Sequence, residues 1–138
     1  MVLLGGGRTF IAGADIREFG QPPRGKPLHE VLDSMENSDK IIVAAIHGTA
    51  LGGGLEVTLC CHYRFAVPNS MVGLPEVKLG LIPGAGGTQR LPRLVGAIKA
   101  LDLITSGNFV PAPQALELGI VDEIGGNLLE GSVAFAEK

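Results

Sequence analysis

The chain has 138 residues, of which 46% are apolar and 18% are charged, and its net charge is −3. This length and composition predict a single globular domain with its own core and exclude a disordered chain. With one tyrosine and no tryptophan, the acidic chain lacks the basic, aromatic-rich surface that binds nucleic acid, so we expect no nucleic-acid partner.

Short apolar runs alternate along the chain with segments whose apolar residues recur at helical spacing. In chain order we expect a strand at 2–4, a helix at 28–37, a strand at 41–46, a helix at 55–61, strands at 63–67 and 71–74, helices at 91–104 and 113–118, a strand at 120–124 and a helix at 128–138. Glycine-rich turns are expected at 48–54 and 79–87, and Pro92 is expected in the first turn of its helix. The alternation of strands and helices predicts an α/β fold with parallel strands.

Two adjacent cysteines, Cys60 and Cys61, are expected to be reduced thiols of an intracellular protein. His62 follows them, but three consecutive residues do not have the spacing of a tetrahedral metal site, so we expect no metal. The chain has no apolar run of about 18 residues, and residues 1–7 lack the features of a signal peptide. We therefore expect neither a membrane partner nor secretion.

Three glycines, Gly52, Gly53 and Gly54, lie between an apolar strand and an apolar helix. Such a helix start offers free N–H groups that can bind a phosphate or an oxyanion. The motifs of P-loops, dinucleotide-binding folds and serine hydrolases are absent, which leaves oxyanion stabilisation as the favoured role. Glu56 lies one turn inside this helix among apolar residues; the alternative is a surface glutamate beside a structural turn.

A second carboxylate, Glu76, follows Pro75 at the end of an apolar strand. Burial raises the pKa of a carboxyl group towards neutrality, where the group can both donate and accept protons. Two such groups facing one substrate could add water to a polarised double bond or move a proton along a chain. The alternative is an exposed loop glutamate.

Three motifs follow one another in the chain: Phe-Ile-Ala-Gly-Ala-Asp-Ile at 10–16, Ala-Ala-Ile-His-Gly at 44–48 leading into Leu-Gly-Gly-Gly-Leu-Glu at 51–56, and Val-Gly-Leu-Pro-Glu at 72–76 leading into Leu-Ile-Pro-Gly-Ala-Gly-Gly-Thr-Gln-Arg-Leu at 81–91. In this order and spacing they resemble the crotonase (enoyl-CoA hydratase/isomerase) superfamily. Details such as Cys-His-Tyr-Arg at 61–64 resemble the hydratase/isomerase part of multifunctional fatty-acid β-oxidation enzymes. The resemblance implies a spiral of ββα turns.

The resemblance also implies a role for each matched residue. Ala14 and Gly53 match the residues whose backbone N–H groups form the oxyanion hole. Glu56 matches the carboxylate that activates water, and Glu76 matches the one that delivers a proton to the α-carbon. Four further positions are expected to bind the substrate and its CoA: Ala12, Gly13, Asp15 and Gly52.

The implied reaction is hydration of trans-2-enoyl-CoA to 3-hydroxyacyl-CoA in fatty-acid β-oxidation. The alternatives are a Δ3,Δ2-enoyl-CoA isomerase and a non-catalytic acyl-CoA-binding scaffold. The resemblance implies no permanently bound cofactor, with coenzyme A present only as part of the substrate. It also implies a homo-oligomer, a trimer, or fusion to a 3-hydroxyacyl-CoA dehydrogenase, in the bacterial cytoplasm or the peroxisome.

A complete crotonase domain is longer than this chain, so we expect residues 1–138 to be a partial domain that lacks the first strands and the last helices. Lys40-Ile41 stands where the family has Lys-Pro. The segment 83–90 is expected to form a wall of the acyl pocket without taking part in chemistry. Arg90 and Arg93 are expected on a solvated helix face, with CoA phosphates as the alternative, and His47 is expected to pack structurally.

Overall fold

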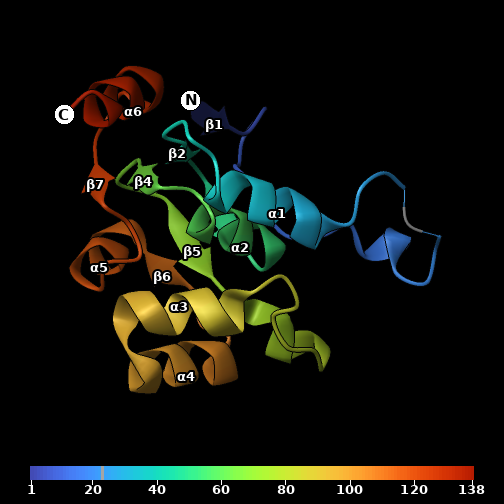
Figure 1. The fold of residues 1–138 in the computed structure, drawn as a ribbon. Helices are drawn as coiled ribbons and strands as arrows, with labels where there is room; N and C mark the ends of the chain where they lie inside the picture. Colours follow the sequence, from blue (N-terminus) through green and yellow to red (C-terminus); the bar gives the residue numbers. More distant parts are fainter. Residues whose placement is uncertain (23) are drawn as a thin grey trace.

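The computed structural model describes residues 1–22 and 24–138 and contains two β-sheets (Figure 1). The first sheet has four parallel strands in the order β1 (Val2–Leu4), β2 (Val43–Ile46), β4 (Tyr63–Ala66) and β7 (Glu123–Ile124). The second sheet has three strands in the order β3 (Thr49–Leu51), β5 (Met71–Gly73) and β6 (Val110–Pro111). Strands β3 and β5 are parallel, whereas β5 and β6 are antiparallel.

The chain alternates between the two sheets and so forms a spiral. Strand β2 leads to β3 and then to α2 (Gly53–Leu59), and β4 leads to β5 and then to α3 (Gly87–Val95) and α4 (Ala97–Ser106). An earlier turn runs from β1 through Ile11, which forms a parallel bridge with Ala50, to α1 (Leu28–Glu36). The two later turns therefore each add one strand to each sheet, and the earlier turn adds β1 to the first sheet and the Ile11 bridge to the second. This arrangement confirms the expected spiral of ββα turns.

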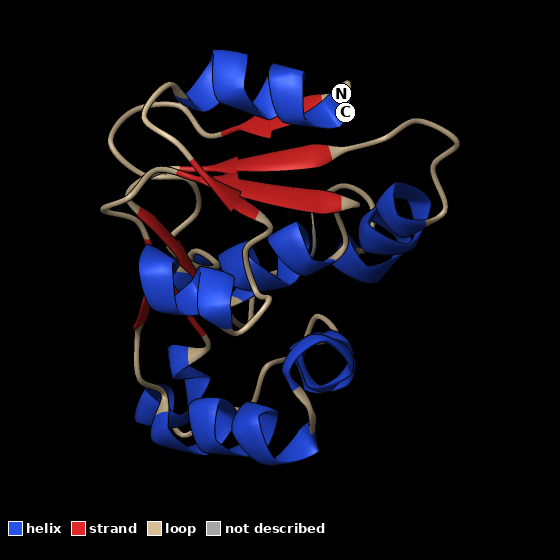
Figure 2. Cartoon of the chain, turned by 90° about the vertical axis from the view of Figure 1, so that its left-hand side faces the viewer, coloured by secondary structure: helices blue, strands red, loops and turns tan. Residues whose placement is uncertain are grey.

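The remaining helices complete the packing. They are the 3₁₀ helices η1 (Ile16–Glu18) and η2 (Pro75–Leu79) and the α-helices α5 (Ala112–Glu117) and α6 (Leu128–Ala136). Helix α6 packs against β1, β2 and β4, and α2, α3 and α4 lie on the other side of the four-stranded sheet (Figure 2). All four residues of β2 are buried, because this central strand is covered on both faces. Within the described residues, none of the helices is long and apolar enough to cross a bilayer.

Two strand predictions were wrong in part. The expected strand at 120–124 pairs only at Glu123–Ile124, because the backbone N–H groups of Ile120 and Val121 both donate to the carbonyl of Ala115 at the end of α5. The short antiparallel strand β6 was not expected, so the strands are not all parallel. The expected turn at 48–54 contains β3 and the first residues of α2.

The expected helix at 91–104 is two helices. Gly96 separates α3 from α4 with a φ of 83°, a conformation that favours glycine. Helix α3 also begins earlier than expected, at Gly87, so Pro92 is its sixth residue and does not lie in the first turn. The early start has a physical cause, since the N–H of Gly87 donates to the side chain of Glu56.

Close contact between Ile11 and the first turn of α2 generates a prediction. A Cβ atom on Gly54 would overlap the carbonyl oxygen of Ile11, whereas a Cβ on Gly53 would have no atom within 4 Å. We expect Gly54→Ala to lower the free energy of unfolding by about 2–3 kcal/mol, as overpacking does. The matched control Gly53→Ala should stay within about 0.5 kcal/mol of the wild type. Urea denaturation measures both, and equal stability of the two variants would contradict this packing.

Candidate active site

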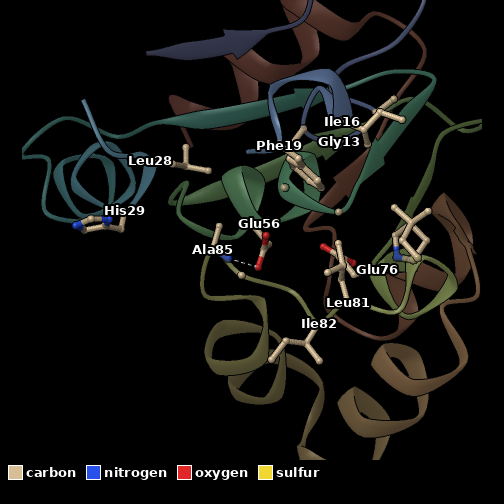
Figure 3. A pocket seen from close by; sticks show the side chains of 17 residues that line it. Gly13, Ile16, Phe19, Leu28, His29, Glu56, Glu76, Leu81, Ile82 and Ala85 are labelled. Atoms are coloured by element: carbon tan, nitrogen blue, oxygen red, sulfur yellow. Dashed lines mark hydrogen bonds between the residues drawn. The ribbon is translucent and has the colours of Figure 1, made fainter. Parts of the chain in front are cut away.

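A cavity of about 580 Å³ lies where the spiral brings three segments together (Figure 3). Each segment follows a position in the second sheet: residues 12–14 follow Ile11, α2 follows β3, and η2 follows β5. Because Ile11, β3 and β5 are parallel neighbours, their carboxyl ends lie along one edge of the sheet. The residues that come next in the chain therefore line a common cavity.

Glu56 is the fourth residue of α2, and only 2% of its surface is exposed. Its Oε1 accepts two backbone hydrogen bonds of 2.8 Å, from the N–H groups of Ala85 and Gly87. Oε1 is therefore occupied, and Oε2 is left for a ligand in the cavity. The alternative of a surface glutamate at position 56 is wrong.

Glu76 is the second residue of η2 and lines the same cavity as Glu56. Burial raises the pKa of Glu76 above its usual value; the negative charge of Glu56 adds to the rise, and a hydrogen bond from the residue's own backbone opposes it. The side chain is partly exposed, yet its Oε2 is enclosed and accepts no hydrogen bond from the described residues. A Cβ atom built on Gly52 would lie 3.2 Å from the Oε1 of Glu76, so this carboxylate lies beside the start of α2.

Two backbone N–H groups border the same space. Gly53 is the first residue of α2, and its N–H has no carbonyl to bind within the helix. The N–H of Ala14 donates to no acceptor within residues 1–22 and 24–138. Both residues line the cavity together with Ala12, Gly13 and Gly52. The cavity thus combines two carboxylates with two N–H groups that have no partner in the part of the chain that the structure describes.

Asp15, which was expected to bind substrate, is not among the residues that line the cavity, although its neighbours Ala14 and Ile16 are. Its exposed carboxylate accepts three hydrogen bonds from the side chain of Arg17 and one from the Arg17 backbone. These bonds lower the pKa of Asp15. The carboxylate caps η1 and so fixes the loop that carries Ala14.

The apolar part of the lining was not predicted from the sequence. It consists of Ile16, Phe19, Leu28, Leu79, Leu81 and Ile82, with His29 beside them. All six apolar side chains are at least 45% exposed, so they form an open wall of the cavity and no part of the core. Their exposure is the one signal that separates them from core residues, and it is not visible in the sequence.

The segment 83–90 does more than form a wall, because two of its N–H groups hold Glu56. His47 has a structural contact, as expected, because its Nε2 lies 3.1 Å from the carbonyl oxygen of Gly7. Nδ1 of His62 accepts the N–H of Ile42. Arg93 lies on an exposed helix face, where it donates to the carbonyl of Gln89.

The two cysteines are free and buried, and burial raises the pKa of Cys60 to about 11 and that of Cys61 to about 12. Within the described residues no three His, Cys, Asp or Glu side chains are grouped so that they could hold a metal ion.

The chain is similar to known proteins over nearly its whole length. Residues 1–137 match the family model described as enoyl-CoA hydratase/isomerase. The peroxisomal bifunctional enzyme of Danio rerio is 53% identical over 139 residues, which cover 100% of this chain and 19% of that protein. The probable enoyl-CoA hydratase of Bacillus subtilis (strain 168) is 49% identical over 131 residues, which cover 88% of this chain and 50% of that protein.

A solved structure of enoyl-CoA hydratase from Bacillus anthracis superposes with a TM-score of 0.90 at 38% identity, over 99% of this chain and 56% of that one. The chain therefore spans between 19% and 56% of the length of these relatives. The match over nearly every residue, together with the crotonase-type fold, confirms the resemblance drawn from the sequence motifs. This chain belongs to the enoyl-CoA hydratase/isomerase family.

Proposed function

We propose that this chain carries the active site of an enoyl-CoA hydratase, which adds water to a trans-2-enoyl-CoA and forms a 3-hydroxyacyl-CoA. The observation that carries the proposal is the pairing of Glu56 and Glu76 in one cavity beside two N–H groups without partners among residues 1–22 and 24–138. Relatives named as an enoyl-CoA hydratase and as a peroxisomal bifunctional enzyme support it.

In the proposed mechanism, the thioester carbonyl accepts hydrogen bonds from the N–H groups of Ala14 and Gly53. These bonds strengthen as the carbonyl becomes an enolate, and each is worth about 3–4 kcal/mol of barrier. Glu56 takes a proton from the water whose oxygen bonds to C3, and Glu76 gives a proton to C2. The proton that Glu56 took from water is then transferred to Glu76, which restores both carboxyl groups to their starting states. The net change is the addition of one water molecule.

The environments of the two carboxylates fit these roles. The raised pKa of Glu76 favours a protonated group that can donate to C2. The two N–H donors fix Glu56 through Oε1, so its free oxygen can receive the proton of the attacking water. No step requires a bound cofactor, and coenzyme A enters as part of the substrate.

A second candidate is a Δ3,Δ2-enoyl-CoA isomerase. One carboxyl group that takes a proton from one carbon and returns it to another is sufficient for that reaction, and the raised pKa of Glu76 suits such a shuttle. A non-catalytic acyl-CoA-binding scaffold is less well supported. It would not need an enclosed Glu76 oxygen that accepts no hydrogen bond from the described residues.

The wider context follows from the relatives. We propose that residues 1–138 form part of one crotonase-like domain that acts in fatty-acid β-oxidation, and that a dehydrogenase domain accompanies it; the 19% coverage of a relative named as a bifunctional enzyme supports the fusion. A peroxisomal or bacterial cytoplasmic location fits the named relatives. A trimeric assembly stays a prediction.

The first prediction of this proposal concerns hydration of crotonyl-CoA, followed by loss of the enoyl thioester absorbance. We expect Glu56→Gln and Glu76→Gln each to reduce kcat by about 10²–10⁴-fold, because each removes one proton-transfer group. Glu117→Gln, which alters an exposed glutamate of α5, is the matched control and should keep wild-type activity. Full hydratase activity in either active-site variant would refute the two-carboxylate mechanism, and isomerase activity that needs only Glu76 would favour the second candidate.

A further prediction concerns stability and does not depend on turnover. The pKa of Glu76 is higher in the folded protein than its usual value of 4.5, so ionisation of this group opposes folding. The stability that the protonated group contributes is present below the usual pKa and is lost as pH rises through the raised pKa. We therefore expect the free energy of unfolding of Glu76→Gln, measured against that of the wild type, to increase as the pH is raised from 4 to 7. Urea unfolding at each pH measures this difference. A difference that stays constant or reverses would contradict the burial of this carboxyl group.

A further inference from the structure

Arg90 lies outside the cavity lining, yet its side chain connects two segments that form the cavity. It is the fourth residue of α3, and only 16% of its side chain is exposed. On one side its Nε and Nη2 donate to the two carboxylate oxygens of Glu36 on α1, at 3.2 and 2.8 Å. On the other side its Nη1 donates to the carbonyl oxygen of Ala85, at 3.2 Å.

The carbonyl that Arg90 holds belongs to a residue whose N–H holds Glu56. Ala85 donates its N–H to Oε1 of Glu56 (Figure 3). Its carbonyl accepts a hydrogen bond from Arg90, so Ala85 is fixed from both sides of its backbone. The next residue, Gly86, has a φ of 94°, and a Cβ atom there would overlap Nη1 of Arg90. The guanidinium therefore fills the space that a side chain at position 86 would need, and the N–H of Gly87 then reaches Glu56.

We propose that Arg90 is a positioning residue, which holds the 84–87 loop so that two backbone N–H groups orient Glu56 for water activation. The catalytic part of this inference rests on the proposed hydratase function, whereas the structural part does not. The expectation of a solvated helix face for Arg90 was wrong, because each of its three side-chain nitrogens donates to a protein acceptor.

The contacts of Arg90 use the planar guanidinium group, whose nitrogens point in different directions. Three different nitrogens reach acceptors on α1 and on the loop, and a lysine has a single nitrogen that cannot meet both. Glu36 is half exposed, so the ion pair alone adds little to stability. The main effect of losing Arg90 should therefore be on the geometry of Glu56, where a small displacement can cost about 10²-fold in rate.

The first test measures amide hydrogen exchange by NMR in the wild type, Arg90→Met and the matched control Arg93→Met. We expect Arg90→Met to accelerate exchange at Ala85 and Gly87 at least about tenfold, with Ala44 and Phe65 in the four-stranded sheet unchanged. Arg93→Met should leave all four amides unchanged, since within the described residues the Arg93 side chain hydrogen-bonds to the carbonyl of Gln89 and not to the 84–87 loop. Wild-type exchange at Ala85 and Gly87 in Arg90→Met would overturn the proposal.

If Arg90→Met fails to fold, the same exchange measurement is made on Arg90→Lys, which keeps the charge and the apolar stem of the side chain. Local loss of protection at Ala85 and Gly87 in this variant supports the proposal, and unchanged protection refutes it. This arm needs no turnover, so it separates a failure of the positioning role from a failure of the proposed hydratase function.

The second test is a double-mutant cycle in crotonyl-CoA hydration. We expect Arg90→Met to lower kcat about 10–100-fold with KM nearly unchanged, because Arg90 does not line the cavity. In a Glu56→Gln background the same change should lower the residual kcat less than twofold, since its target is already lost. An undiminished effect in that background would show that Arg90 does not act through Glu56.

Discussion

The hydrogen bonds to Oε1 of Glu56 are the interaction on which the rest of the site depends. A carboxylate that is 2% exposed would be strongly unfavourable without partners, because its desolvation must be offset by hydrogen bonds. The partners are backbone N–H groups from Ala85 and Gly87, which belong to the next turn of the spiral. Holding Glu56 thus fixes where α3 begins, how the preceding loop bends and where one wall of the cavity lies.

The parallel pairing of β3 and β5 explains why both carboxylates reach one cavity. In this register Leu51 pairs with Gly73, and each is the last residue of its strand. Glu56 and Glu76 follow these positions by a few residues, in the first turns of α2 and η2. The site is therefore a consequence of the sheet edge, and the sequence distance between the two glutamates matters little.

Much of the fold was predictable because the central strands are strongly apolar. The pattern at β2, β4 and β5 identifies buried strands, and the family motifs then imply the spiral. Strand β6 was missed because two residues, one of them Pro111, give no periodic signal. The early start of α3 was missed because it depends on hydrogen bonds to a side chain about thirty residues earlier, which local propensity cannot reveal.

The glutamates and glycines of the site were found from their motifs, but the way Glu56 is held and the role of Arg90 were not.

The spiral also sets an order of events during synthesis. As the chain leaves the ribosome, strand β2 can pair with β1 and α2 can form while the Glu56 carboxylate still lacks its donors. Until residues 85–87 emerge, that carboxylate favours solvated, open conformations of the first turns. The group most important for the proposed chemistry therefore has its hydrogen-bond donors only once residues 85–87 are in place, so the third turn of the spiral is needed to complete the cavity.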